Sequence, residues 1–343
     1  MSIKKPKILI IGHGGTVAMT PSSKGLVATK STEELLELVP TLSSLADIEV
    51  KQFDNIDSTN VNPKHWSKLI VEIAAQVKNF DGIIITHGTD TMAYTATALS
   101  LGLGKGLKIP IVLTGSQLPI DSFPTDARIN LERATFTLTE AIAQNVAEVM
   151  IVFDDVVLRG NRSIKISESR FKAFDSPAFP HLADISATGI NFSSRTTRRD
   201  DNSELDIRSD FDDGIVTIEL VPGLRPSLIR SIIDNDECHG ILLKSLGAGN
   251  VPNLAEYSVL PVIEYATSLN IPVVLTTKFV GGVVLAGHYE VNQSALDAGA
   301  VATNDLTDVA AQVKFMWALA QGIRSSSELD RFINTDIVGE VTN

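Results

Sequence analysis

Hydroxyl and carboxylate side chains follow an apolar run in the first half of the chain. The run is Ile83-Ile84-Ile85, and Thr86-His87-Gly88-Thr89-Asp90 comes directly after it. Three β-branched residues in succession predict a buried parallel strand. Open α/β sheets bind ligands beyond the carboxyl ends of their strands, so Thr89 and Asp90 are candidates for chemistry. The alternative for Asp90 is a cap at the start of the helix that follows.

A second cluster follows the first apolar run of the chain. Residues 7–11 are Lys-Ile-Leu-Ile-Ile, and Gly12-His13-Gly14-Gly15-Thr16 comes next. A dinucleotide-binding loop needs a third glycine where Val17 stands, and no Gly-Lys-Ser/Thr of a phosphate-binding loop follows. The bare backbone amides beside the Thr16 hydroxyl suit an oxyanion hole. A simple glycine turn is the alternative.

Lys165 is a third candidate for chemistry. It follows a predicted strand, in a segment that also contains Asn161 and Ser163. By itself this residue is typical of a solvated lysine. Held near Thr89 and Asp90, however, a partly desolvated lysine would accept the proton of the threonine. The three residues would then be a nucleophile, its activator and an orienting carboxylate, although Asp90 would equally suit the ammonium group of an amino-acid substrate.

The composition narrows the class of protein. The 343 residues are 44% hydrophobic and 20% charged, which is ordinary for a soluble chain long enough for two domains. The net charge of −12 argues against nucleic acid as a main partner, because phosphates would be repelled. Cys238 is the only cysteine, and the six histidines show no ligand spacing, so neither an intrachain disulfide nor a metal site is expected.

The apolar runs of the chain are short. Residues 8–11 are too few for the apolar region of a signal peptide, and no run approaches the ~20 residues of a membrane span. We therefore expect no membrane partner and a cytoplasmic location.

The order of the elements predicts an α/β fold with two domains. Predicted strands alternate with predicted helices through short loops, which favours a mostly parallel sheet covered on both faces. Residues 191–213 are rich in Ser, Thr, Arg and Asp, and we interpret them as a linker, with a surface loop inside one domain as the alternative. We expect a flavodoxin-like domain with the catalytic residues over 1–190, and a smaller α/β domain over 214–343.

The expected elements are located as follows. Predicted strands cover residues 7–11, 48–53, 83–85, 109–114, 146–153, 215–220, 240–244 and 271–276. Predicted helices cover residues 31–45, 93–101, 126–143, 253–268 and 305–321, and a further helix begins with Asn62 as its cap and Pro63 at its first position. Residues 20–29 are small and polar, which predicts a loop or flap.

Two segments of the chain resemble the signature motifs of a known family. Gly14-Gly15-Thr16-Val17-Ala18 resembles one signature motif of the bacterial-type L-asparaginases, and residues 86–92 match the other motif residue for residue. Shorter similarities to the same family cover residues 57–59, 113–119, 159–165 and 246–252. The Gly-Asn-Arg-Ser-x-Lys sequence at 160–165 is most similar to that of the cytoplasmic type I branch.

The resemblance implies a reaction and a set of residues. Thr16 and Thr89 would be the two catalytic threonines, with Asp90 and Lys165 assisting Thr89. The family hydrolyses the side-chain amide of L-asparagine to L-aspartate and ammonia through an acyl-threonine, without a cofactor, as a homodimer or homotetramer. The implied substrate-binding residues are Asp57, Ser58, Thr59, Gly88, Ser116 and Asn250, the last reaching a neighbouring subunit.

The chain departs from the family pattern at the flap. Relatives carry a tyrosine there, whereas this chain has Leu26, which cannot transfer a proton. His13 stands where the family usually has threonine, and one hypothesis makes it a replacement base near neutral pH; the alternative is a structural histidine. Lys244 and Lys278 alter the type I allosteric site, so we expect no allosteric control.

The altered flap leaves two further hypotheses open. One is hydrolysis of another amide, such as that of glutamine, because the flap borders the substrate. The other is a catalytically impaired family member that binds an amino acid.

Overall fold

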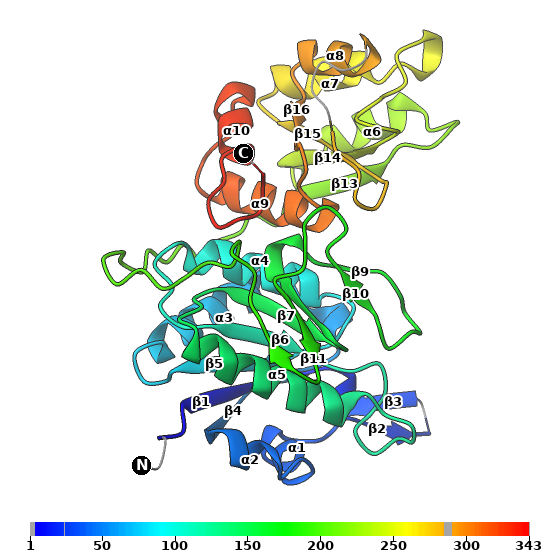
Figure 1. The fold of residues 1–343 in the computed structure, drawn as a ribbon. Helices are drawn as coiled ribbons and strands as arrows, with labels where there is room; N and C mark the ends of the chain where they lie inside the picture. The colour runs from blue at the N-terminus through cyan, green and yellow to red at the C-terminus, as the bar shows by residue number, and fades with distance from the viewer. Residues whose placement is uncertain (1–3, 24, 285–289, 343) are drawn as a thin grey trace. The chain divides into compact units, whose positions relative to one another are not determined.

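The chain divides into two compact units. The structure is a computed structural model that describes residues 4–23, 25–284 and 290–342. Contacts within the chain define a first unit that ends at Ser209 and a second that begins at Asp210 (Figure 1). Most of the segment interpreted as a linker therefore clusters with the first unit.

The first unit is built on one large sheet. Within the described residues it has eight strands, in the order β12-β11-β8-β7-β6-β5-β1-β4. These strands are β1 (Lys7–Gly14), β4 (Asp47–Ile56), β5 (Gly82–Thr86), β6 (Ile111–Thr114), β7 (Val149–Phe153), β8 (Val156–Arg159), β11 (Ala183–Ser186) and β12 (Gly189–Ile190). The five neighbouring strands β7, β6, β5, β1 and β4 pair in parallel. The pairs β7 with β8, β8 with β11, and β11 with β12 are antiparallel.

The strand order confirms the predicted flavodoxin-like arrangement. Numbered along the chain, the five parallel strands lie in the spatial order 2-1-3-4-5, because β4 lies outside β1 and the chain then crosses to β5. The order reverses between β1 and β5, which are direct neighbours with Gly12 opposite Thr86. Such a reversal opens a crevice beyond the carboxyl ends of the two strands, and both candidate motifs follow them.

Helices cover both faces of this sheet (Figure 1). They are α1 (Thr32–Glu37), α2 (Leu42–Leu45), α3 (Pro63–Gln76), α4 (Met92–Leu103) and α5 (Ala127–Ala143). Short 3₁₀ turns lie at η1 (Thr16–Ala18), η2 (Ser58–Asn60) and η3 (Gly160–Arg162). Two small hairpins complete the unit, β2 (Met19–Ser22) with β3 (Gly25–Ala28), and β9 (Ile164–Lys165) with β10 (Phe174–Asp175).

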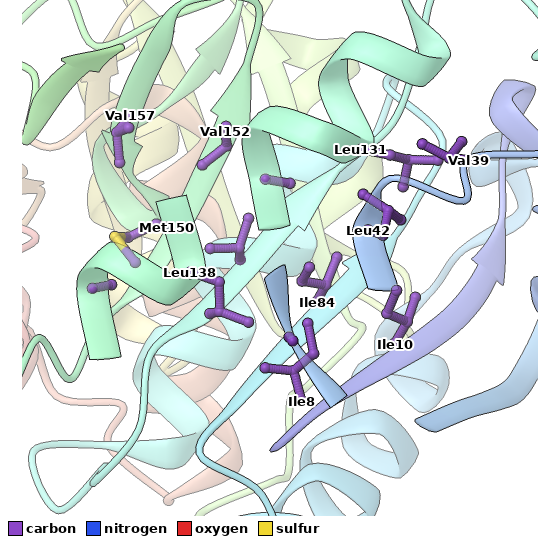
Figure 2. Close-up of a cluster of buried hydrophobic side chains, with 14 of the residues drawn as sticks. Ile8, Ile10, Val39, Leu42, Ile84, Leu131, Leu138, Met150, Val152 and Val157 are labelled. Carbon is purple, nitrogen blue, oxygen red and sulfur yellow. The ribbon is translucent and has the colours of Figure 1, made fainter. Parts of the chain in front are cut away.

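The core explains why the sheet is stable. Ile8 and Ile10 of β1 and Ile84 of β5 pack in one cluster with Leu131 and Leu138 of α5 (Figure 2). The residues between them on β1 and β5 are also buried, so both faces of each strand are covered. This continuous burial is the reason that these strands are uninterrupted apolar runs rather than alternating ones.

One predicted helix is divided in two. It begins as expected, because the Ser31 hydroxyl accepts from the Glu34 amide at 3.2 Å and the Glu34 carboxylate accepts from the Ser31 amide at 2.7 Å. The helix ends at Glu37, however, and α2 starts only at Leu42. Pro40 lies in the interruption, where its ring and missing N–H break the helical hydrogen bonds.

The second unit is a smaller parallel sheet. Its described strands lie in the order β13 (Ile215–Glu219), β14 (Gly240–Ser245), β15 (Val273–Thr277) and β16 (Val301–Ala302). Its helices are α6 (Pro226–Ile233), α7 (Leu260–Ser268), α8 (Glu290–Asp297), α9 (Asp308–Ala320) and α10 (Ser326–Ile333). Separate apolar clusters lie on the two faces of the sheet. The two-domain α/β class is confirmed, and no helix in the described residues is long and apolar enough to cross a bilayer.

The predicted helix over 253–268 is only half correct. Residues 255–257 form the 3₁₀ turn η4 (Ala255–Tyr257), and α7 begins at Leu260. Pro261 is the second helical residue, and proline is tolerated there because the first amides of a helix have no partner within it. The same proline prevents α7 from extending further towards the N-terminus.

A buried ion pair fastens the end of the second unit. Lys314 on α9 and Glu340 are both 0% exposed, and their charged groups lie 2.6 Å apart. The Lys314 ammonium also donates to the carbonyls of Ile333 and Thr335 at 2.9 and 2.6 Å. The residues after α10 are therefore joined to α9.

Candidate active site

Lys165 connects the two polar residues that end the motif after β5. Its Nζ donates to Thr89 Oγ1 at 2.8 Å and to Asp90 Oδ1 at 2.7 Å. Thr89 is buried, the Lys165 side chain is 17% exposed and the Asp90 side chain is 55% exposed. A hydroxyl, a lysine Nζ and a carboxylate thus meet beyond the carboxyl end of β5, with the carboxylate open to solvent.

The helix-cap alternative for Asp90 is wrong. Helix α4 begins at Met92 and Thr91 is its cap residue, without a side-chain cap hydrogen bond. The Asp90 carboxylate bonds to Lys165 instead, and the Thr91 hydroxyl donates to the Ser58 carbonyl at 2.8 Å. The polar side chains of this loop are therefore directed to other elements rather than to the start of α4.

Lys165 reaches the site because the chain turns back after the parallel sheet. Strand β8 runs antiparallel to β7, and the buried Arg159 at its end pairs with the buried Glu148. The Ser163 hydroxyl donates to the Arg159 carbonyl at 2.7 Å and closes the η3 turn. Lys165 follows in β9, opposite Phe174 of β10.

The two motif loops are in backbone contact. Gly15 has a φ of 85°, and a Cβ built there would lie 2.3 Å from the Gly88 backbone nitrogen. Only glycine permits both this conformation and this approach. Thr16 comes next and begins η1, partly buried, so its hydroxyl lies one residue from the point where the loops meet.

Four of the predicted substrate-binding residues are adjacent to this contact. Ser58 is buried, and a Cβ at Gly88 would lie 2.5 Å from its Oγ. Asp57 and Thr59 flank Ser58 and are exposed, and the Asp57 carboxylate accepts from the Thr59 amide and hydroxyl at 2.9 Å each. The loop after β4 therefore lies beside the loop after β5.

The two remaining predicted residues have other surroundings. Ser116 is fully buried and its hydroxyl donates to the Leu118 carbonyl at 2.6 Å, so it supports the loop after β6. Asn250 belongs to the second unit, where its backbone forms two hydrogen bonds with Leu246 at 2.7 and 3.0 Å. Contact of Asn250 with a neighbouring subunit stays a prediction.

His87 is held as a neutral ring by hydrogen bonds. Its Nδ1 donates to the Gly88 carbonyl at 2.7 Å, so its Nε2 accepts from the Thr95 hydroxyl at 2.9 Å. The Trp66 indole donates in turn to the Thr95 oxygen at 3.1 Å. Burial lowers the pKa of His87 to about 4, which agrees with the neutral ring that these bonds require.

His13 has the features of a structural histidine. It is 1% exposed, and its ring lies edge-on to Phe53 and His87, with centroids 5.2 and 5.0 Å away. Burial, followed by the nearby rings of His87 and His65, lowers the pKa of His13 to about 3. Such a ring is a weak base near neutral pH, so it does not suit the task of the missing flap tyrosine.

For the asparagine hydrolysis that the family resemblance implies, replacing His13 with alanine is expected to leave turnover within about threefold of wild type, since loss of a true general base costs about 10²–10⁴-fold. The measurement is ammonia release from asparagine between pH 5 and 9, with Thr16→Ala in parallel. A His13→Ala enzyme as inactive as Thr16→Ala, at a temperature where it is folded, would return the histidine to the mechanism.

The flap forms a hairpin rather than an irregular loop. Strands β2 and β3 pair antiparallel, and the hydroxyls of Thr20 and Thr29 lie 2.8 Å apart at its base. Leu26 lies on β3 and is 47% exposed. The position matched to the family's tyrosine is therefore apolar and accessible.

Gln117 is a site residue that the sequence reasoning missed. It lies in the loop after β6, and its Oε1 accepts from Thr89 Oγ1 at 3.4 Å. Its place after the strand next to β5 was a usable signal, because the carboxyl ends of neighbouring parallel strands meet at one edge.

The fold and the site together define a class of protein. A threonine that is hydrogen-bonded to a lysine lies where the strand order of a flavodoxin-like sheet reverses. Such a threonine is suited to nucleophilic attack on a carbonyl. Family models agree, because "Asparaginase, N-terminal" matches residues 7–198 and "Glutaminase/Asparaginase C-terminal domain" matches residues 215–332. The chain belongs to the asparaginase family and is an amidohydrolase, so the resemblance seen in the sequence is confirmed.

Individual relatives cover nearly the whole chain. The L-asparaginase of Thermococcus kodakarensis is 35% identical over 98% of this chain and 99% of its own length, and its solved structure superposes with a TM-score of 0.89. L-asparaginase I of Vibrio cholerae is 29% identical, covers 99% of this chain and all of its own, and has a TM-score of 0.86. A glutamyl-tRNA(Gln) amidotransferase subunit of Pyrococcus horikoshii is 32% identical over 98% of this chain and 77% of its own length.

Proposed function

We propose that this chain hydrolyses the side-chain amide of L-asparagine to L-aspartate and ammonia, with Thr89 as the nucleophile. The observation that supports this most is Lys165 Nζ, 2.8 Å from Thr89 Oγ1 and 2.7 Å from Asp90. A weakly acidic hydroxyl needs an adjacent base to attack an amide, and a base needs a partner that stabilises it once it is charged.

The proposed acylation step moves one proton through Lys165. The Lys165 amine takes the Thr89 proton while Oγ1 bonds to the amide carbon, and Asp90 stabilises the ammonium that forms. The same proton passes to the amide nitrogen, the carbon–nitrogen bond breaks, and ammonia leaves. Water then attacks the acyl-threonine, which releases aspartate and restores the hydroxyl.

The carbonyl oxygen needs hydrogen-bond donors as its negative charge develops. The Gly15 amide already donates to the Ile56 carbonyl at 3.1 Å, so the candidates are the other backbone amides around Thr16, whose loop touches Gly88. The Thr16 hydroxyl would lie at the same position and donate to the oxygen or to the attacking water.

The substrate's own charged groups require fixed partners. The exposed Asp90 carboxylate suits the α-ammonium group, and Ser58 with the neighbouring Asp57 and Thr59 suits the rest of the amino-acid backbone. Gly88 and Ser116 shape the loops around them. Asn250 would be contributed by a neighbouring subunit in a homodimer or homotetramer. We also propose a cytoplasmic location for the protein.

Ammonia release tests the reaction and its substrate. Purified protein is incubated with L-asparagine, L-glutamine and their D-isomers, with Thr89→Ala as the control. We expect release from L-asparagine that Thr89→Ala abolishes. Turnover of glutamine in preference to asparagine would reassign the substrate. No turnover of any amide, with a melting temperature raised by aspartate, would establish an amino-acid-binding protein instead.

A further inference from the structure

One amide side chain joins the proposed nucleophile to the hairpin that carries its activator. Gln117 accepts from Thr89 Oγ1 at 3.4 Å through its oxygen. Its nitrogen donates to the carbonyls of Ser167 and Arg170 at 3.2 and 3.0 Å. These two carbonyls belong to the loop that starts directly after Lys165.

The backbone of Gln117 is itself firmly held. Its amide and that of Leu118 donate to the Asp126 carboxylate, at 2.9 and 3.1 Å for the shorter bonds. Asp126 is buried at the start of α5 and also accepts from the Asn130 side chain at 3.2 Å. The Gln117 side chain therefore extends from a backbone held by Asp126 towards the exposed loop after Lys165.

The strands of this hairpin are anchored, because Phe174 is buried with its ring centroid 5.0 Å from that of Phe153, but the loop at its tip is exposed. Strands β9 and β10 contain two residues each, and hairpins so short are at best marginally stable. Residues 166–173 form its loop, and Ile166, Arg170 and Phe171 are exposed. The two bonds from Gln117 attach this loop to the body of the first unit, close to the strand that carries Lys165.

The hydrogen bonds of Thr89 link the attached loop to the proposed nucleophile. A hydroxyl has one proton and two lone pairs. In the structure Lys165 donates to one lone pair, and the Gln117 oxygen accepts the hydrogen bond of the hydroxyl. In the proposed attack Lys165 is in its amine form, the hydroxyl proton turns from Gln117 to Lys165, and a lone pair is left for the carbonyl carbon of a substrate.

We propose that Gln117 is a positioning residue for the hydrolysis proposed above. With its nitrogen it fixes the loop after Lys165, and with its oxygen it orients the Thr89 hydroxyl. Loss of Gln117 lets Lys165 move relative to Thr89, and a misplacement of about 1 Å costs on the order of 10²-fold in rate. The inference depends on the proposed function for its kinetic consequence, but the attachment of the hairpin can be tested separately.

Two variants of Gln117 and one control separate the effect of its side-chain nitrogen from that of its side-chain oxygen. Gln117→Met has a similar length without polar groups, and Gln117→Glu keeps an acceptor for Thr89 but has no donor for the two carbonyls. Gln144→Met is the matched control, because the Gln144 amide donates to the Ile190 carbonyl at 3.3 Å without any bond to Thr89 or the hairpin.

We expect kcat for asparagine to fall about 10²-fold in Gln117→Met, with KM within about threefold, while Gln144→Met stays near wild type. A drop in kcat in Gln117→Glu as large as in Gln117→Met would mean that the donor end carries the effect. All comparisons are made well below the melting temperature of each variant. A Gln117→Met enzyme with kcat within twofold of wild type would overturn the proposal.

Amide hydrogen exchange supplies a readout that needs no turnover. Peptides covering residues 166–173 should exchange faster in Gln117→Met and Gln117→Glu than in wild type or Gln144→Met. Unchanged exchange would disprove the attachment even if kcat fell. If wild type released no ammonia from any amide, the hydrolysis would be disproved, and the exchange result would still decide whether Gln117 holds the hairpin.

Discussion

Replacing Lys165 with methionine is expected to lower kcat for asparagine by about 10³-fold, the middle of the range for a lost general acid–base group. Methionine retains much of the aliphatic length and removes both hydrogen bonds, at 2.8 Å to Thr89 and 2.7 Å to Asp90. The Thr89 proton then has no acceptor, and the departing ammonia loses its proton donor. Steady-state ammonia release, with the melting temperature of each protein, measures the effect.

The control for this prediction lies on the same hairpin. Lys172 is exposed in the loop between β9 and β10, and Lys172→Met should remain within about twofold of wild type. Because Thr89, Asp90 and Lys165 would act as one unit, a Lys165→Met/Asp90→Asn double variant should lose much less than the product of the two single losses. A Lys165→Met enzyme within tenfold of wild type would show that another group accepts the proton.

Replacing Lys314 with methionine is expected to lower the free energy of unfolding by about 3–5 kcal/mol, the usual cost of breaking a buried ion pair on one side. Both partners are fully buried, and Lys314 also satisfies the carbonyls of Ile333 and Thr335. The variant leaves Glu340 charged and buried without Lys314, and with backbone amides such as those of Ile337 and Val338 as its donors. Denaturant unfolding, followed by a probe in the second unit, measures the change.

A second substitution and a change of pH test the cause of this loss. Lys314→Met/Glu340→Leu should recover part of the stability, because no unpaired charge remains. Burial alone would raise the pKa of Glu340, but the charge and hydrogen bond of Lys314 and the backbone amides hold it below its ordinary value. A folded-state pKa below the unfolded one contributes stability above about pH 4.3, which is lost as the pH falls through the folded value.

The difference between wild type and Lys314→Met should therefore shrink in acid. A loss below 1 kcal/mol at pH 7, or one that does not depend on pH near 3, would contradict the assignment of this stability to the ion pair.

The local features of the chain were predictable because their physical causes lie in neighbouring residues. The capping box at Ser31 and the Asn62-Pro63 start of α3 are satisfied within three residues, so their signals are complete in the sequence. The buried run at 83–85 is β5 because a strand covered on both faces must be apolar at every position. The mostly parallel sheet followed from strands that alternate with helices, whereas the order of its strands is seen only in the structure.

Contacts between distant segments were less predictable. The ion pair of Lys165 with Asp90 joins residues 75 positions apart, and it arose in the sequence reasoning as a possibility that the family resemblance then favoured. Gln117 was missed although its place after a strand next to β5 was a signal, because the sequence does not show which side chain of that loop reaches Thr89. His13 was assigned two alternatives, since only the fold determines whether an imidazole at the end of a strand faces solvent or other rings.

By itself, the sequence determined that this is a two-domain α/β protein with a threonine and an aspartate at the end of a central strand. Those conclusions rest on periodicity, caps and spacing, which act over a few residues. Only the tertiary structure decided that Asp90 pairs with Lys165 rather than capping α4, that His13 is buried and neutral, and that Gln117 bonds to the hairpin. Each of these depends on packing between segments, where burial and the available partners select one interaction from several that the same side chain is able to make.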